Sequence, residues 1–262
     1  MTQSVNFDRA AGFYDDTRDF PAGEEVRIAE LIATAGNLSA DSRVLEIGVG
    51  TGRIALPLVK HTGEMHGADI SHLMLKRLCE KRIDEDVYPV VADAGCLPYA
   101  DDSFDIVLIV NVLHLITELE PVNAEMVRVL RPGGRLLRCY PVHDDRFRQM
   151  YHVWHNATTP KTVASWLSTP DFLVENGWRV ISDGHVHRFG RKRVPQQLIE
   201  NNKNRVWSST WNLSDEQIER GVAALQTHID EHYDDASVAI DVEDAFHVVV
   251  YEVIDGTQYQ IV

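Results

Sequence analysis

The chain contains little cysteine and no long, uninterrupted apolar run. Of its 262 residues only three are cysteines, and none of them stands in the Cys-x-x-Cys spacing of a redox or zinc site. The longest apolar stretch, 106–116, is interrupted by Asn111 and His114, which makes it too polar and too short for a membrane span. The first residues lack the basic and apolar regions of a secretory signal. We therefore expect a cytoplasmic protein with reduced thiols and no membrane association.

Basic residues are also in deficit. Twenty-five Lys and Arg stand against 40 Asp and Glu, a net charge of −15, which repels nucleic acid and disfavours an RNA or DNA substrate. One basic cluster remains, and it contains Arg188, Arg191, Lys192 and Arg193. These side chains either balance nearby acids or bind an anionic group of a substrate.

A glycine-rich turn follows the first strongly apolar segment. Residues 44–53, VLEIGVGTGR, predict a buried strand and then a turn with Gly48, Gly50 and Gly52, where a ligand can approach the backbone closely. A dinucleotide-binding turn needs glycine at positions one, three and six, but the sixth position is Arg53. Glu46 would place a carboxylate near a phosphate. A cationic or hydroxyl-rich ligand suits this turn better.

Further acidic residues follow the next predicted strands. The segment 64–71 reads as a strand that ends in Asp69, which is placed to accept both hydroxyls of a ribose, as in NAD enzymes. The segment 87–116 contains a third strand, Asp93-Ala94, a Leu-Pro turn and a fourth strand that ends near Asn111. Residues 128–137 indicate a helix, a Pro-Gly-Gly turn and a fifth strand. Seen alone, Asp69 would be a strand-end turn residue and Asp93 an Asx-turn residue.

Taken together, these motifs resemble class I S-adenosylmethionine-dependent methyltransferases, especially the small-molecule, ubiquinone/menaquinone-methyltransferase-like members. The resemblance covers roughly residues 40–140. It implies that Asp69 binds the ribose, that Asp93 and the Ala94 amide meet the adenine, and that Glu46 faces the methionine end. The residues it assigns to S-adenosyl-L-methionine are Tyr14, Glu46, Gly48, Gly50, Thr51, Gly52, Asp69, Ile70, Asp93, Ala94 and Asn111.

Strands that alternate with helices predict an α/β, Rossmann-like fold. We expect a seven-stranded, mostly parallel sheet with helices on both faces. The chain divides into an N-terminal helical cap over 1–36, a cofactor-binding core over 37–189, a helical lid insertion over 190–240, and a closing strand over 241–262. In relatives of this kind the cap's tyrosine, here Tyr14, closes over the cofactor; a helix that merely packs Tyr14 on the sheet is the alternative.

Histidine is the side chain best matched to proton transfer at neutral pH. His114, just past the fourth strand, and His143, just past the fifth, are the candidate catalytic bases, although each also fits a purely structural role. His152 with His155, and His185 with His187, lack a third ligand at metal-site spacing, so we expect no metal. Trp207 and Trp211 are spaced to share one helix face and wall an aromatic or apolar pocket.

The sequence thus predicts a methyltransferase that acts on a small molecule, a transferase of class EC 2.1.1. Two alternatives remain open at this point. One is an NAD(P)-dependent oxidoreductase on a Rossmann sheet, which the residue at position 53 disfavours. The other is a non-catalytic S-adenosylmethionine-binding protein, because intact cofactor motifs do not prove turnover.

Overall fold

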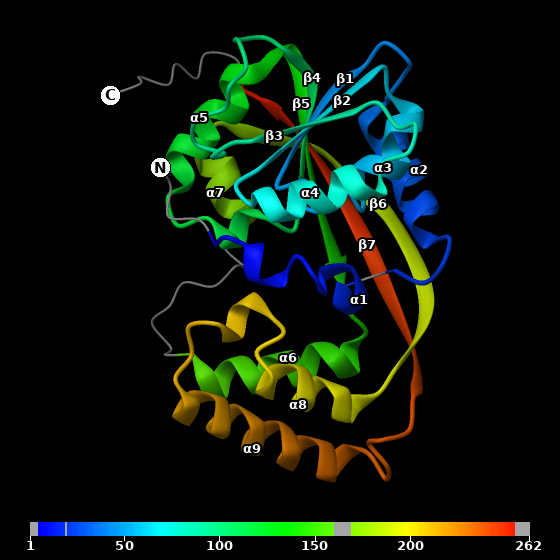
Figure 1. Ribbon diagram of the computed structural model, residues 1–262, viewed down its shortest axis with the longest axis vertical. Helices are drawn as coiled ribbons and strands as arrows, with labels where there is room; N and C mark the ends of the chain where they lie inside the picture. Colours follow the sequence, from blue (N-terminus) through cyan, green and yellow to red (C-terminus); the bar gives the residue numbers. More distant parts are fainter. Residues whose placement is uncertain (1–4, 19, 160–168, 255–262) are drawn as a thin grey trace. The chain divides into compact units, whose positions relative to one another are not determined.

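The computed structural model describes residues 5–18, 20–159 and 169–254. The chain divides into two compact units (Figure 1). The first comprises Met1–Pro141, Trp166–His187 and Phe246–Val262, and the second comprises Val142–Ser165 and Arg188–Ala245. In the part of the chain that the structure describes, no helix combines the length and apolar character needed to cross a membrane.

Seven strands form one sheet, in the order β3-β2-β1-β4-β5-β7-β6. All four pairs from β3 to β5 are parallel, and β7 runs opposite to β5 (Figure 1). The predicted seven-stranded, mostly parallel sheet is therefore confirmed. The strands are β1 (Arg43–Ile47), β2 (Glu64–Asp69), β3 (Val87–Val91), β4 (Phe104–Val110), β5 (Leu130–Val142), β6 (Trp178–Arg193) and β7 (Ile240–Val253).

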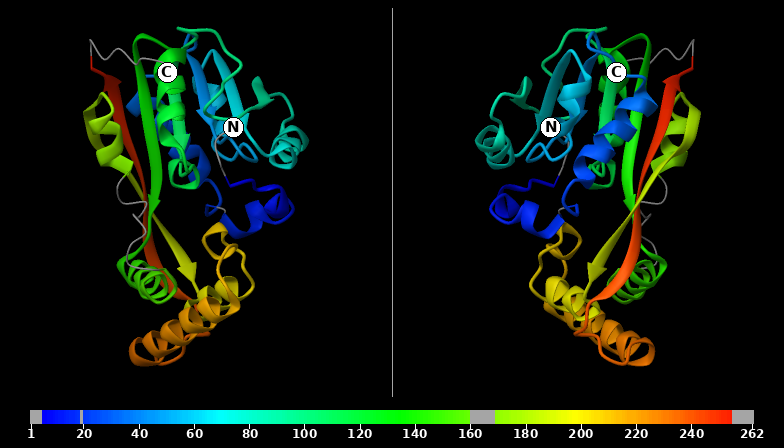
Figure 2. Two further views of the ribbon diagram at one scale, coloured as in Figure 1. Left: turned by 90° about the vertical axis from the view of Figure 1, so that its left-hand side faces the viewer. Right: turned by 90° about the vertical axis from the view of Figure 1, so that its right-hand side faces the viewer.

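Helices cover both faces of the sheet in the first unit (Figure 2). On one face lie α5 (Leu119–Val129) and α7 (Thr169–Glu175), and on the other lie α2 (Glu24–Gly36) and α3 (Ala55–Leu58). The amphipathic α2 ends because Asn37 takes the left-handed conformation, with φ of 52°. The helix α4 (His72–Lys81) begins at Ser71, whose hydroxyl accepts a hydrogen bond from the Met74 amide.

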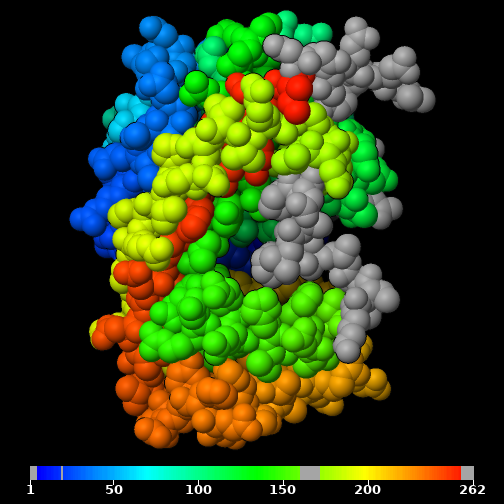
Figure 3. Space-filling view, turned by 180° about the vertical axis from the view of Figure 1, so that it is seen from behind, coloured from blue at the N-terminus to red at the C-terminus, as the bar shows by residue number. Residues whose placement is uncertain are grey.

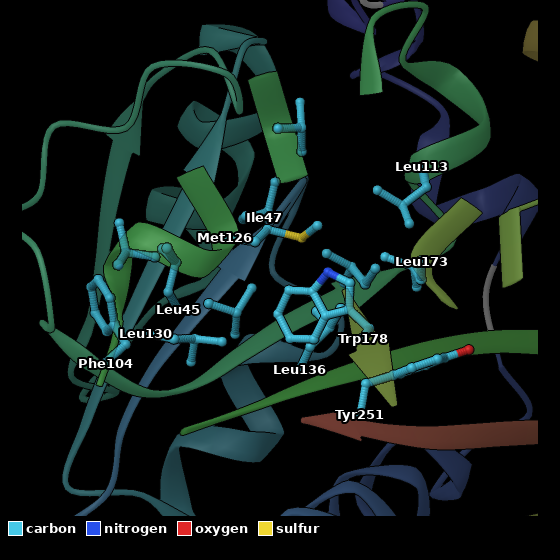
Figure 4. Close-up of a cluster of buried hydrophobic side chains, with 14 of the residues drawn as sticks. Leu45, Ile47, Phe104, Leu113, Met126, Leu130, Leu136, Leu173, Trp178 and Tyr251 are labelled. Carbon is cyan, nitrogen blue, oxygen red and sulfur yellow. The ribbon is translucent and has the colours of Figure 1, made fainter. Parts of the chain in front are cut away.

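The main core of the first unit lies between the sheet and α5 (Figure 4). Strand side chains such as Leu45 and Leu136 pack there with Met126 of α5. Trp178, the first residue of β6, is fully buried in this cluster, and its indole N–H donates a hydrogen bond of 2.6 Å to Asn123. This bond satisfies the one polar atom of the indole and ties β6 to α5.

The turn predicted at Pro132 to Gly134 is an irregularity at the start of β5. Phe104 of β4 pairs with Leu130, but Ile106 pairs with Arg135, so β5 carries extra residues between these two pairs. Gly133 takes φ of 79° there. From Arg135 onward β5 continues in regular parallel register with β4, which fixes the direction of every later side chain on the strand.

The second unit is helical. It contains α6 (Asp145–Thr158), α8 (Pro195–Lys203), a 3-10 turn at Ser208–Thr210 and α9 (Asp215–His232), and α6 and α9 lie side by side in Figure 3. Ser214 and Gln217 form a capping box at the start of α9. The unit includes 142–165, a segment that the sequence-based division assigns to the core.

The predicted helical pairing of Trp207 and Trp211 is wrong. Trp207 has an extended backbone at the start of the 3-10 turn, with φ of −93° and ψ of 141°, whereas Trp211 follows the turn. The indole N–H of Trp211 donates to the Arg205 carbonyl at 2.9 Å. Because a three-residue 3-10 turn, and not an α-helix, joins the two residues, their spacing of four does not place them on one face.

A small residue in α9 sets how closely α6 approaches it. A side chain at Gly221 would overlap the ring of Trp154 and the methyl group of Thr158. We expect Gly221→Ala to destabilise the second unit by about 1 to 3 kcal/mol, despite the better helix propensity of alanine. Thermal unfolding of this variant beside Glu219→Ala, an exposed position of the same helix, measures the effect. Equal melting temperatures for both variants would contradict this packing.

Candidate cofactor site

The glycine turn lies at the carboxyl end of β1, in the middle of the sheet. Gly48 has φ of 75°, and its amide donates to the Ala68 carbonyl at 2.8 Å. A Cβ at this position would lie 2.5 Å from Val112, which follows β4. Glycine is therefore required both by the backbone conformation and by the closeness of the neighbouring segment.

Asp69 holds this turn against the start of α4. One carboxylate oxygen accepts from the Gly50 amide at 2.8 Å, and the other accepts from the Ser71 amide at 2.8 Å. Burial raises the pKa of Asp69, and the two amides oppose the shift by stabilising the carboxylate. The side chain is thus a fixed acceptor at the tip of β2, as the sequence predicts.

Two ionisable side chains beside the turn retain unused hydrogen-bonding capacity. Glu46 is 2% exposed, and its Oε2 has no hydrogen-bond partner among the described residues. Burial raises its pKa well above the usual value, although the charge of Arg53 opposes this. Nη1 of Arg53 is likewise buried without a described hydrogen-bond partner, while its guanidinium lies 4.6 Å from the Phe20 ring centroid. A buried acid and a half-buried base therefore flank the turn in sequence, each with a buried atom available to a ligand.

The N-terminal segment is tied to the same end of the sheet. It contains a 3-10 turn at Asp8–Ala10 and the helix α1 (Tyr14–Arg18). The Asp8 carboxylate accepts from the Ser71 hydroxyl at 2.6 Å, and the Asp15 carboxylate accepts from the Thr51 hydroxyl at 2.5 Å. The Val5 amide donates to the Leu115 carbonyl at 3.2 Å. These contacts hold the segment against the glycine turn, the start of α4 and the segment after β4.

These elements enclose an open cavity within the first unit. Of the residues predicted to bind the cofactor, those that line it are Tyr14, Gly48, Gly50, Asp69, Ile70, Ala94 and Asn111. Glu46, Thr51 and Asp93 are each next to a lining residue in the chain, and Gly52 is two residues from Gly50. The cavity thus brings together residues of the N-terminal segment and of the ends of four strands, β1, β2, β3 and β4.

Asp93 forms an Asx turn, in which its carboxylate accepts from the Gly95 amide at 2.9 Å. Its neighbours Ala92 and Ala94 line the cavity. The turn fixes the backbone beside the cavity. The interpretation of Asp93 as an Asx-turn residue is therefore compatible with its interpretation as a residue that meets the adenine.

Sequence reasoning missed the apolar part of the cavity wall. The additional lining residues are Val5, Phe7, Ile47, Ala68, Met74, Ala92, Val110, Val112, Leu115 and Ile116. Several of them have the sequence pattern of ordinary core residues. Only the fold shows that the core is open at one end, where these residues line the cavity. The segment after β4 was detectable, because it directly continues a strand that ends at the ligand edge.

His114 lies between two lining residues, in the 3-10 turn Leu113–Leu115. Its side chain reaches solvent, yet the surrounding protein atoms desolvate the ring. This desolvation and the positive charge of Arg138 lower the pKa of His114. The imidazole is therefore neutral at neutral pH and able to accept a proton.

His143 belongs to the second unit, and it is not among the residues that line the cavity. Its Nδ1 accepts from the Arg193 guanidinium at 3.0 Å, and this guanidinium also pairs with buried Asp244 at 2.5 Å. Burial acts to raise the pKa of Asp244, but His143 and Arg193 hold it well below its usual range. One ring nitrogen of His143 is thus already engaged.

The basic cluster of β6 pairs with acids of β7. Arg188 contacts Glu243 at 3.3 Å, and Lys192 contacts Asp241 at 3.0 Å. Since Arg193 also pairs with an acid of β7, the interpretation that these side chains balance nearby acids is confirmed for all three. In the described segments no group of three or more His, Cys, Asp or Glu is arranged to hold a metal ion.

Residues 45–138 match the family model described as a methyltransferase domain. The matched segment runs from β1 into β5 and includes the glycine turn, Asp69, Asp93 and the segment after β4.

The present chain matches only part of the length of the curated proteins that it resembles. The chain is 38% identical over 120 residues to the methyltransferase GfsG of Streptomyces halstedii, covering 44% of this chain and 42% of that protein. It is 37% identical over 139 residues to the ubiquinone/menaquinone biosynthesis C-methyltransferase UbiE of Azotobacter vinelandii, covering 50% and 55%. The chain therefore spans about half the length of these curated relatives.

Among solved structures, the fold is similar to that of the YcgJ protein from Bacillus subtilis. The TM-score is 0.58 with 19% sequence identity, and the match covers 88% of this chain and 99% of that one. At this identity the similarity shows the fold alone, and function rests on other observations.

Proposed function

We propose that this protein transfers a methyl group from S-adenosylmethionine to a small-molecule acceptor. The observation that carries the proposal is the cavity at the carboxyl ends of β1, β2, β3 and β4, which Asp69 and the glycine turn line, with Glu46 and Arg53 flanking that turn in sequence. The methyltransferase domain over 45–138 supports the same activity. The third residue after Gly50 is Arg53, which disfavours a nicotinamide dinucleotide.

The residues fit the parts of this cofactor. Asp69 accepts the ribose hydroxyls, and the backbone around Asp93 and Ala94 contacts the adenine. Glu46 faces the ammonium and Arg53 the carboxylate of the methionine end, because each has a buried atom without a described hydrogen-bond partner. Tyr14, which lines the cavity and stacks edge-on against Phe7 with ring centroids 5.8 Å apart, covers the cofactor from the N-terminal segment.

When bound, the cofactor would supply an electrophilic methyl group on its sulfonium, with the neutral thioether as the leaving group. The protein aligns the two reactants and excludes water. If the acceptor atom carries a proton, neutral His114 receives it. The role of His143 as a catalytic base remains a prediction, and only the chemistry of its imidazole ring supports it. The apolar wall formed by Val112, Leu115 and Ile116 favours an aromatic or apolar acceptor.

Calorimetric titration with S-adenosylmethionine, S-adenosylhomocysteine and NAD in parallel tests the proposed cofactor. We expect micromolar binding of the first two ligands and none of NAD. Incubation with radiolabelled S-adenosylmethionine and a metabolite extract then tests turnover by the formation of labelled product. Binding of NAD alone would overturn the proposal, and binding without product would favour a non-catalytic protein.

Asp69→Ala should weaken binding of S-adenosylhomocysteine by about 1 to 3 kcal/mol, because the ribose loses a charged acceptor. Titration calorimetry measures the change, and circular dichroism checks that the fold remains. Asp16→Ala, at an exposed position of α1, is the matched control and should bind normally. Unchanged affinity in Asp69→Ala would remove this residue from the ribose site.

Cofactor binding should release a proton from Glu46. Burial favours the protonated acid in the free protein, whereas the cofactor's ammonium favours the carboxylate, so affinity should increase with pH over the range in which Glu46, with its raised pKa, loses its proton. Titrations in buffers of different ionisation enthalpy measure the proton count. Glu46→Gln cannot release this proton and should bind more weakly at the upper end of the range. The same pH dependence in this variant would assign the proton to another group.

His114→Ala should lower turnover by about a hundredfold or more when the acceptor atom carries a proton, and should leave cofactor affinity unchanged. In the wild type, turnover should fall as pH drops through the lowered pKa of His114 and reach a plateau by neutral pH. The rate of S-adenosylhomocysteine formation against pH measures both effects, with His61→Ala as the control. Normal turnover of His114→Ala at every pH would exclude it as the base.

A further inference from the structure

We propose that Arg138 binds an anionic oxygen group of the acceptor beside His114. This inference rests on the proposed function and specifies the acceptor more narrowly, as a small molecule with a carboxylate or an ionised hydroxyl. Arg138 and the residues around it all belong to the first unit.

Strand register places Arg138 in line with the cavity. Ile47 of β1 pairs with Ile109 of β4, and Ile109 pairs with Arg138 of β5. Paired residues of neighbouring parallel strands point to the same face of a sheet, and the strands are about 4.8 Å apart. Because Ile47 lines the cavity, Arg138 lies on the same face and about 10 Å away along this row.

The cavity also borders the next pair of residues between β4 and β5. Asn111, which lines the cavity, donates its amide to the carbonyl of Cys139 at 3.0 Å. Arg138 is therefore adjacent in the chain to a residue that is bonded directly to the cavity wall. An acceptor that extends from the cavity toward β5 reaches this guanidinium before any other basic group of the strand on that face.

Arg138 lacks the carboxylate partner that Arg43 and Arg131 of the same sheet have. Arg43 pairs with Glu64 at 2.7 Å, and Arg131 pairs with Asp105 at 2.7 Å. Across the described segments, no carboxylate lies within ion-pair distance of Arg138. Its guanidinium instead lies 4.5 Å from the centroid of the Tyr140 ring. A half-buried cation without a carboxylate is unexpected in a chain with 40 acidic and 25 basic residues.

Aromatic side chains from β5 and β7 surround the guanidinium. Burial raises the pKa of Tyr251, and nearby Arg138 opposes this shift. Figure 4 shows the hydroxyl end of Tyr251 pointing away from Leu136 and Trp178. The Tyr140 ring stacks on His247, with centroids 5.5 Å apart. Flat rings beside a guanidinium suit an aromatic molecule that bears a negative charge.

Arg138 also acts on the candidate base. Its charge contributes to the lowered pKa of His114. An oxyanion bound to Arg138 cancels much of this charge, so the imidazole gains proton affinity when the acceptor is in place. The same residue therefore has two effects: it selects an anionic acceptor and it adjusts the base that serves that acceptor.

The test uses small probes on the full-length protein saturated with S-adenosylhomocysteine. Benzoate and neutral benzamide are titrated in matched experiments, and carbon-labelled histidine spectra follow the pKa of His114. We expect benzoate to bind at least about tenfold more tightly than benzamide and to raise the pKa of His114. In Arg138→Gln, the preference for benzoate and the benzoate-dependent change at His114 should both disappear.

Arg135→Gln is the matched control, because it removes the same charge from β5 but from the opposite face, three residues earlier. It should retain the preference for benzoate. A second arm uses 4-nitrophenol, whose absorbance reports the phenolate: stabilised phenolate without benzoate binding identifies an ionised hydroxyl as the preferred group, and the reverse identifies a carboxylate.

Several results would overturn the inference. They are equal binding of benzoate and benzamide with no stabilised phenolate, or the same preference for the anion in the wild type and in Arg138→Gln. Failure of the proposed function has a different signature, since S-adenosylhomocysteine would then fail to bind before any probe is added.

Discussion

The site depends on one carboxylate that accepts two backbone amides. Asp69 receives hydrogen bonds from Gly50 in the glycine turn and from Ser71 at the start of α4, and so joins segments that follow two different strands. The amides orient its oxygens and compensate for part of the cost of burying a charge. Ser71 in turn donates its hydroxyl to Asp8. The glycine turn, α4 and the N-terminal segment thus share one set of polar contacts, and the cavity lies among them.

Much of this arrangement could be predicted from the sequence, because it depends on short-range signals. The strand that leads into Gly48, the acid at Asp69 and the cap at Ser214 each follow from residue types within a few positions. The alternation of strands and helices then fixed the parallel sheet and brought the strand ends to one edge. The family resemblance added roles for Asp93 and Ala94 that their positions beside the cavity support.

The remainder depends on contacts that local patterns do not encode. Trp207 and Trp211 have helical spacing, but a 3-10 turn begins between them, so the spacing carries no information about a shared face. Arg138 stands in an ordinary strand, and only the register with β4 relates it to the cavity. His143 follows β5 as closely as expected, yet its partners Arg193 and Asp244 come from distant strands. Pairing between distant segments decided each of these cases.

The bond between the Val5 amide and the Leu115 carbonyl has a consequence for the order of folding. The first described residue of the chain has its partner in the segment after β4, so it cannot reach its final position until β1, β2 and β4 have assembled. Contacts of such long sequence separation form late, because closing the intervening loop costs entropy that only an assembled sheet repays. On the ribosome, this segment emerges before β4 and yet reaches its final position only after β4 has formed, so this part of the cavity wall cannot be completed before the strands are.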